Sequence, residues 1–226
     1  MRVPLTRFGW PQVVAYPAAI FVLFVLSLVW ALTHPAPLPW LAAALLAGLL
    51  VWTLAFFRDP QRTIPTDPAV LLAPADGKII DIHRVQETTF INGPALRITI
   101  FLSIFDVHIN RAPCNVTVEA ITYKPGKFKN AMKPAAARVN ESNDLMLIRT
   151  DPPHDRLILR QISGAIARRI VCTAKPNETL TAGQRFGMIK FGSGTELYVP
   201  ARENLKCLVK IGDKVKAGLS PVVRYL

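Results

Sequence analysis

Residues 13–32 read VVAYPAAIFVLFVLSLVWAL and residues 40–57 read WLAAALLAGLLVWTLAFF, and neither stretch contains a charged residue. Each is about as long as the ~20 apolar residues that an α-helix needs to cross a bilayer core. Neither has a polar face, which disfavours the alternative of two helices buried in a soluble core. No small-residue cleavage site separates them, which argues against a removable signal peptide. Residues 1–60 are therefore predicted to form a membrane-anchoring helical hairpin.

Arginines flank this hairpin at its two outer ends. Arg2 and Arg7 precede the first stretch, Arg58 and Arg62 follow the second, and the loop at residues 34–39 has no Lys or Arg. The positive-inside rule then places both ends in the cytoplasm and the loop outside. A hairpin that enters one leaflet without crossing has the same pattern, so the depth of insertion stays open. The predicted location is the cell membrane, with the rest of the chain on its cytoplasmic face.

The remainder of the chain is strongly basic. The net charge is +12, and residues 1–60 contribute three arginines and one aspartate, which leaves +10 for residues 61–226. A surplus of this size predicts an anionic partner, either nucleic acid or anionic lipid. No Arg/Lys-rich helix, zinc spacing or RNP-type aromatic pattern is present, so we expect lipid headgroups and no nucleic acid. The three cysteines form no CxxC pair, and no metal site is predicted.

Residues 61–226 have the pattern of a β-rich domain. Short apolar or alternating runs are separated by Gly and Pro turns, and no helical period extends beyond about a dozen residues. The predicted fold class is mainly β (α+β), a hydrophobic helical hairpin followed by a barrel-sandwich-like domain of short strands. Residues 211–223 resemble the hairpin of biotinyl and lipoyl carrier domains, and residues 180–189 repeat the pattern more loosely. The repetition suggests pseudo-twofold symmetry. The expected strands are residues 78–82, 95–103, 116–123, 145–150, 157–162, 166–173, 186–190, 196–199 and 205–211.

Three short segments carry candidate chemistry. Ser193 lies between two glycines in KFGSGTE, directly after an apolar run, so the backbone around its hydroxyl is uncrowded. A plain β-turn is the alternative there. Asp76 lies in PADGK, which is a turn signature that also carries a carboxylate. His108 lies in FDVHINRAP among polar neighbours, and such surroundings tune an imidazole near neutrality.

The order of these segments resembles that in phosphatidylserine decarboxylase proenzymes of the short bacterial and archaeal type. The longer branch of that family reads LGST at its cleavage point, whereas this chain reads FGSG with Thr195 one place later. Arg111 stands where the longer branch has a second histidine. The matching segments cover almost the whole chain: FFRDPQRTIP (56–65), APADGKI (73–79), FDVHINRAP (105–113), YKPGKF (123–128), NES (140–142), ISGAIARRIV (162–171) and IKFGSGTELYVP (189–200).

The resemblance implies a self-processing enzyme. The chain would cut itself between Gly192 and Ser193, and the large chain (1–192) and small chain (193–226) would remain together as a heterodimer. Ser193 would become a pyruvoyl group, the cofactor, which forms a Schiff base with the amine of phosphatidylserine and takes up the electrons released with CO2. Phosphatidylethanolamine would be the product. Asp76 and His108 are implied as the catalytic partners of Ser193, with their division of roles open.

The phosphate of such a substrate needs cationic contacts, for which Arg62 and Arg111 are the candidates. A diacyl or an ether lipid with the serine headgroup would serve equally, and a higher homo-oligomer stays open. Two other functions remain alternatives. Asp76, His108 and Ser193 follow the order of a serine hydrolase triad, although Ser193 lacks the GxSxG elbow. A membrane-tethered adaptor barrel without enzymatic activity is the other, and both alternatives predict an uncut chain.

Overall fold

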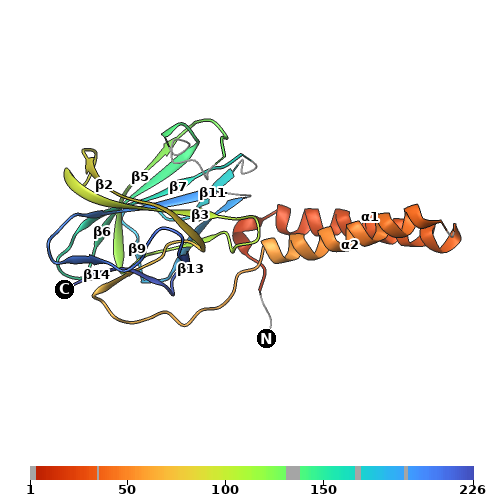
Figure 1. Cartoon of the computed structure of the whole chain (residues 1–226), viewed down its shortest axis with the longest axis horizontal. Helices are drawn as coiled ribbons and strands as arrows, with labels where there is room; N and C mark the ends of the chain where they lie inside the picture. Colours follow the sequence, from red (N-terminus) through yellow and green to blue (C-terminus); the bar gives the residue numbers. More distant parts are fainter. Residues whose placement is uncertain (1–3, 35, 131–137, 166–168, 191–192) are drawn as a thin grey trace. The chain divides into compact units, whose positions relative to one another are not determined.

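The computed structural model describes residues 4–34, 36–130, 138–165, 169–190 and 193–226 (Figure 1). The chain divides into two compact units, Met1–Gln61 and Arg62–Leu226. The first unit is helical and the second is built from strands, so the predicted mainly-β α+β class is confirmed.

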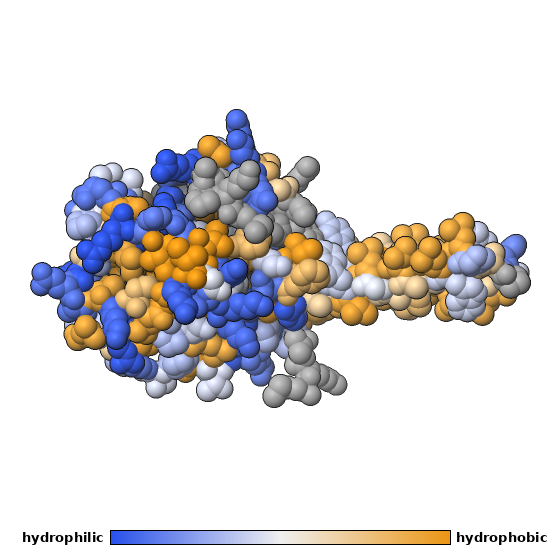
Figure 2. All heavy atoms as spheres, viewed as in Figure 1, coloured by the Kyte–Doolittle hydropathy of each residue, from blue (hydrophilic) through white to orange (hydrophobic). Residues whose placement is uncertain are grey.

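The first unit contains two long apolar helices. A 3-10 turn, η1 (Arg7–Gly9), precedes α1 (Gln12–Thr33) and α2 (Pro37–Phe56). Pro37 begins α2, where the fixed proline φ suits a helix start and no N–H is missed. Ser27 Oγ donates to the Pro39 carbonyl oxygen at 3.3 Å and links the two helices. Both helices are long and apolar enough to cross a membrane, and most of their apolar side chains are exposed (Figure 2). These features indicate membrane association.

The second unit is dominated by one antiparallel sheet in the order β13-β2-β3-β11-β7-β6-β5-β9. Figure 1 shows its long strands lying side by side in a curled layer. In sheet order the bounds are β13 (Lys214–Val215), β2 (Gly77–Glu87), β3 (Gly93–Leu102), β11 (Ser193–Pro200), β7 (Arg156–Ile162), β6 (Ser142–Arg149), β5 (Val116–Lys124) and β9 (Thr179–Leu180).

Two three-stranded sheets accompany it. One has the order β1 (Val70–Leu72), β14 (Pro221–Tyr225), β12 (Leu205–Cys207), and the other β4 (Ile109–Arg111), β10 (Arg185–Lys190), β8 (Arg169–Cys172). Alternate side chains of the long strands, such as Ile98, Leu145 and Leu197, share one buried cluster with Phe186 of β10 and Val223 of β14. The small sheets therefore pack against one face of the long sheet, which is the predicted barrel-sandwich arrangement. We call that face of the long sheet the inner face.

The strand order of the long sheet has pseudo-twofold symmetry about an axis between β11 and β7. Read from either end, the long sheet has equivalent partners: β13 with β9, β2 with β5, β3 with β6 and β11 with β7. The two small sheets correspond as β1-β14-β12 and β4-β10-β8. Even the register shifts coincide, between Ile79 and Asp81 in β2 and between Val118 and Ala120 in β5. One half, β4 to β10, is continuous in sequence and is inserted between β3 and β11 of the other.

The predicted hairpin at residues 211–223 is wrong as a strand pairing. β13 pairs with β2 in the long sheet, whereas β14 pairs with β1 and β12 in a small sheet. A strand, two turns and a second strand were expected in this segment, but β13 and β14 are each hydrogen-bonded to a distant segment because their apolar side chains are buried in the core between the sheets. The likeness between residues 211–223 and 180–189 reflects equivalent places in the two halves, in agreement with the pseudo-twofold symmetry expected from the sequence.

Candidate active site

Ser193 is the first residue of β11, which lies at the centre of the long sheet. Ser193 lies opposite Leu102 of β3, and the next residue of β11, Gly194, lies opposite Ile162 of β7. The residue is fully buried, and Ser193 Oγ has no hydrogen-bond partner in the described part of the chain. A buried hydroxyl that gains nothing from a hydrogen bond is unusual in a folded protein and points to a chemical role.

Buried polar side chains surround the start of β11 on the inner face of the sheet. Asn110 of β4 donates through Nδ2 to Thr195 Oγ1 at 3.2 Å and accepts at Oδ1 from Gln161 Nε2 at 2.9 Å. Asn143 Nδ2 donates to Gln161 Oε1 at 3.1 Å. All four side chains are buried. This connected network holds β4, β6, β7 and β11 in one arrangement directly beside Ser193.

A second row of polar residues lies one step closer to the end of the sheet. Gly194 pairs with Ile162 and Ile162 pairs with Ser142, so one further step along these antiparallel strands brings Ser193, Ser163 and Glu141 into line. The Ser163 N–H donates to the Glu141 carbonyl oxygen at 2.9 Å, which extends the ladder to this step. We call Ser193, Ser163 and Glu141 the terminal row. Glu141 lies in the NES segment and Ser163 in ISGAIARRIV, and neither was assigned a role from the sequence.

His108 is fully buried just before β4. Its Nδ1 lies 2.9 Å from the Asp106 carbonyl oxygen, which can only accept, so Nδ1 carries a proton and Nε2 is the basic nitrogen of the neutral ring. The His108 carbonyl oxygen accepts from the Ile189 N–H at 3.2 Å. The structure therefore places His108 beside β10, the strand that leads into the predicted cleavage point.

Asp76 lies in the turn before β2 and is engaged by an arginine. Arg62 binds it in bidentate fashion, with Nη1 2.6 Å from Oδ1 and Nη2 2.7 Å from Oδ2. The Ala217 N–H donates to Oδ1 at 2.8 Å. Both side chains of this ion pair are largely buried. β3 lies between β2 and β11, so the Asp76 carboxylate is two strands away from the strand that carries Ser193.

The side chains of the two arginines predicted as phosphate ligands are largely buried. Arg62 also donates from Nη1 to the Ala217 carbonyl oxygen at 2.6 Å, in addition to its contacts with Asp76. Arg111 Nη1 donates to the Gly183 carbonyl oxygen at 3.0 Å. Their contact with a substrate phosphate stays a prediction, and their present partners give both a structural task. Gly192, predicted as one side of the cleavage point, lies outside the described residues.

Positive charge accumulates where β10 approaches that point. Lys190 is the last residue of β10, is buried, and pairs in register with Arg169 of β8. Burial lowers the pKa of the Lys190 ammonium, and the neighbouring Arg169 charge lowers it further. Lys190 and Arg169 therefore place two basic groups at the end of the strand that precedes the predicted cleavage point.

A profile of the phosphatidylserine decarboxylase family matches residues 49–222 of this chain. The chain belongs to that family. It is 42% identical to a phosphatidylserine decarboxylase proenzyme of Symbiobacterium thermophilum, over 99% of this chain and 97% of the relative. It is 46% identical to one of Carboxydothermus hydrogenoformans, over 78% of this chain and 84% of the relative. A third, from Nitrosomonas eutropha, is 44% identical over 94% and 91% of the two chains.

Membership of the phosphatidylserine decarboxylase family, which is named for a carboxy-lyase, confirms the resemblance seen in the motifs. In this structure the family-like segments PADGK, FDVHINRAP and NES lie at the same end of the long sheet as Ser193 and Gly194, the described residues of FGSG. The residues there also suit a pyruvoyl group at position 193. A three-carbon keto group occupies about the volume of serine, and the inner face beside it is lined by buried hydrogen-bonding side chains.

Proposed function

We propose that this chain is a self-cleaving, pyruvoyl-dependent phosphatidylserine decarboxylase that works at the cytoplasmic face of the membrane. The observation that carries the proposal is Ser193 itself, fully buried at the start of the central strand with an unpartnered Oγ, in a chain whose relatives are named proenzymes. Its two products, residues 1–192 and 193–226, would stay joined because β11 is hydrogen-bonded along its length to β3 and β7 of the large chain.

Maturation begins with attack of Ser193 Oγ on the Gly192 carbonyl carbon. A C–O bond forms and the peptide C–N bond breaks, which leaves an ester and a free amine at residue 193. Loss of the Ser193 Cα proton expels the Gly192 carboxylate and leaves dehydroalanine, and water then replaces its nitrogen and releases ammonia. His108 Nε2 is the proposed base that takes the hydroxyl proton, since Nδ1 is committed to the Asp106 carbonyl.

A pyruvoyl group at residue 193 would supply an electrophilic ketone for the substrate amine and a sink for the electron pair left when CO2 departs. The chain's own residues have the remaining tasks. The network of Asn110, Gln161 and Thr195 holds the start of the small chain in place after the cut. His108 is the proposed donor that returns a proton to the α-carbon. Asp76 is proposed to act through Arg62 and the Ala217 turn, because these are the groups that it contacts.

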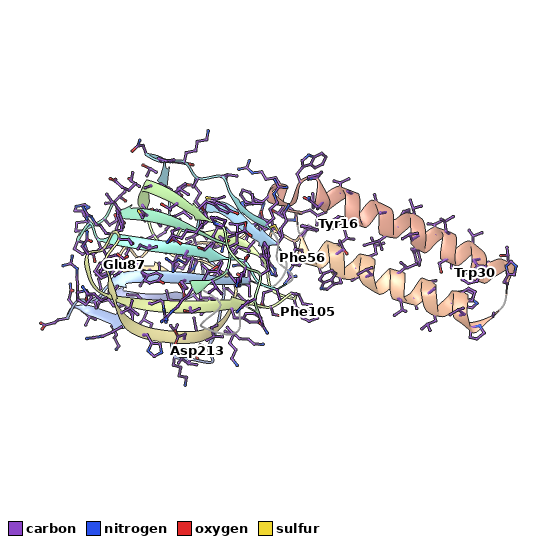
Figure 3. The ribbon with its side chains drawn as sticks, turned by 90° about the horizontal axis from the view of Figure 1, so that it is seen from above. Tyr16, Trp30, Phe56, Glu87, Phe105 and Asp213 are labelled. Atoms are coloured by element: carbon purple, nitrogen blue, oxygen red, sulfur yellow. The ribbon has the colours of Figure 1, made fainter. Side chains whose placement is uncertain are left out.

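The end of the sheet that carries Ser193 also has the character of a lipid-facing surface. Phe105 follows β3 and is 69% exposed (Figure 3). Phe128 and Val139 are exposed in the segment between β5 and β6. Lys127, Lys129 and Arg138 are exposed beside them. We call these six residues the rim. Apolar side chains set among cations suit the boundary between anionic headgroups and acyl chains, which supports a phospholipid as the substrate.

Intact masses of the purified full chain in detergent test the proposal. Two fragments that meet between residues 192 and 193 are expected, and the small one should carry a blocked N-terminus that reacts with hydrazine. Ser193→Ala should remain one chain and release no CO2 from phosphatidylserine vesicles. Ser27→Ala, which changes a serine of α1 outside the site, is the matched control and should be cut normally. An intact wild-type chain with an ordinary hydroxyl at residue 193 would overturn the proposal and return the serine hydrolase and adaptor alternatives.

A further inference from the structure

The terminal row contains three buried oxygens that the described structure leaves without hydrogen-bond partners: Ser193 Oγ, Ser163 Oγ and Glu141 Oε2. Ser163 and Ser193 are fully buried, and Glu141 is 8% exposed. Removing an acceptor from water without giving it a donor costs roughly 1–3 kcal/mol, and more when the acceptor is charged. Ser193 Oγ leaves with the Gly192 carboxylate during the proposed maturation, so Ser163 Oγ and Glu141 Oε2 are the two acceptors that indicate a ligand with several donors.

These oxygens lie on the same face of the sheet. Along each strand, side chains alternate between faces, so Ser193 shares its face with Thr195 and Leu197. By the same alternation Ser163 shares its face with Gln161 and Leu159, and Glu141 with Asn143 and Leu145. The three leucines belong to the hydrophobic core. The inner face therefore changes from apolar core, through the amide network, to the acceptors of the terminal row. Cross-strand neighbours have Cβ atoms about 5 Å apart, which places Ser163 beside Ser193.

Glu141 is held with one oxygen engaged and the other available. Tyr123 OH donates to Glu141 Oε1 at 3.0 Å, and this hydrogen bond to the carboxylate raises the pKa of Tyr123. The Glu141 N–H donates to the Lys127 carbonyl oxygen at 3.1 Å, and the Glu141 carbonyl accepts from Ser163. The carboxylate is thus held by its backbone and by Tyr123, while Oε2 is a buried acceptor without a partner among the described residues.

We propose that Glu141 and Ser163 form the subsite that holds the primary amine of the substrate next to position 193. An ammonium group has three N–H donors and no acceptor, which matches a carboxylate oxygen and a hydroxyl oxygen beside the reacting carbon. Glu141 supplies the opposite charge that makes such hydrogen bonds strong. The inference rests on the proposed function, since it needs the pyruvoyl group at residue 193, and it assigns a task to two residues outside the Asp76, His108 and Ser193 set.

Reductive trapping separates amine binding from maturation. Full-length enzyme is incubated with cyanoborohydride and either dihexanoyl-phosphatidylserine or free L-serine below saturation, and the adduct on the 193–226 chain is measured by mass. Glu141→Gln should be cut and labelled by hydrazine as wild type is, because hydrazine is a small neutral nucleophile that needs no ammonium subsite. In Glu141→Gln the adduct yield from both amines should fall roughly 10- to 100-fold, because a charge-assisted hydrogen bond is lost. Ser163→Ala should lower the adduct yields from both amines by roughly 2- to 10-fold.

Glu119→Gln makes the same chemical change at an exposed position of β5 and should leave all readings unchanged. Adduct yields in Glu141→Gln equal to wild type would overturn the subsite. A fall in adduct yield with the lipid alone would also overturn it, because it would mean that Glu141 recognises another part of the headgroup. A folded Glu141→Gln chain that is not cut would overturn it as well, because it would place the carboxylate in maturation. If Glu141→Gln does not fold, Ser163→Ala decides. Failure of cleavage and hydrazine labelling in wild type would instead refute the proposed function.

Discussion

Asp76 and Asn115 occupy equivalent turns in the two halves of the domain. Asp76 Oδ1 accepts from the Ala217 N–H at 2.8 Å, and Asn115 Oδ1 accepts from the Ala182 N–H at 2.9 Å. Each acceptor precedes a long strand, β2 or β5, and each donor follows a short edge strand, β13 or β9. The side-chain oxygen is therefore a structural feature of both halves. The half with Asp76 adds a negative charge and the partner Arg62.

Replacing Asp76 should separate these two tasks. Asp76→Asn keeps the acceptor for Ala217 but loses the ion pair, whereas Asp76→Ala loses both. Removing one partner of a buried ion pair costs about 3–5 kcal/mol, and we expect Asp76→Ala to reach that range and Asp76→Asn to cost less. Denaturant unfolding in the uncut Ser193→Ala background measures both, and with Ser193 present both should slow self-cleavage. Equal destabilisation by the two changes would show that the turn acceptor contributes nothing.

Gly77 should be irreplaceable, in contrast to Gly93 at the start of β3. Gly77 has φ +150°, and a Cβ added there would lie 2.1 Å from the Phe101 carbonyl oxygen. Gly77→Ala must therefore move β2 away from β3, and we expect a loss of about 3 kcal/mol or more. A Cβ at Gly93 would meet nothing within 4 Å, so Gly93→Ala should change stability by at most about 0.5 kcal/mol. Similar melting temperatures for the two variants would contradict this account.

The rim should matter for substrate in a membrane and not for soluble substrate. Phe105→Asp combined with Phe128→Asp replaces two exposed apolar side chains by anions. We expect decarboxylation on anionic vesicles to fall roughly tenfold, because burial of each aromatic at the interface contributes on the order of 1 kcal/mol or more. Activity on monomeric dihexanoyl-phosphatidylserine should stay near wild type. Leu226→Asp, at another exposed apolar position, is the control. Equal losses on both substrates would place the two phenylalanines in the site rather than at the membrane.

Glu87 at the far end of β2 should make stability depend on pH (Figure 3). Burial alone raises the pKa of its carboxyl, but hydrogen bonds from Thr89 and from the Phe90 and Ile91 N–H groups outweigh it and lower the pKa to about 2. A lowered pKa means that the ionised form stabilises the fold. The contribution is complete above the unfolded pKa near 4.5 and is lost as pH falls toward 2.

Glu87→Gln should accordingly cost about 2 kcal/mol at pH 7, and the difference from wild type should shrink between about pH 5 and pH 2. Chemical denaturation of the Ser193→Ala chain across that range measures it, with Glu119→Gln as the exposed control. A difference that stays constant with pH would mean that the hydrogen bonds do not depend on the charge of Glu87.

Local patterns predicted the elements well. The uncharged stretches at residues 13–32 and 40–57 correspond to α1 and α2 within a few residues, because an uncharged run of about 20 apolar residues is the pattern of a helix long enough to cross a bilayer. The alternating runs became the long strands β2, β3, β5, β6, β7 and β11. Which strands and side chains pair with one another could not be predicted from local patterns. Arg62 and Asp76 are 14 residues apart, and residues 211–223 were read as a hairpin although β13 and β14 join different sheets.

What the sequence by itself determined is therefore the class of the protein, its two apolar helices, and the residue types that chemistry needs, since these follow from short-range periodicity and from motifs. What only the tertiary structure decided is which of those residues meet. Strands more than 90 residues apart become neighbours when their apolar faces are buried in one core. That burial sets the register of the strands, and the register then aligns their polar residues as well. Glu141 and Ser163 reach Ser193 through such a register, across strands whose order no local pattern encodes.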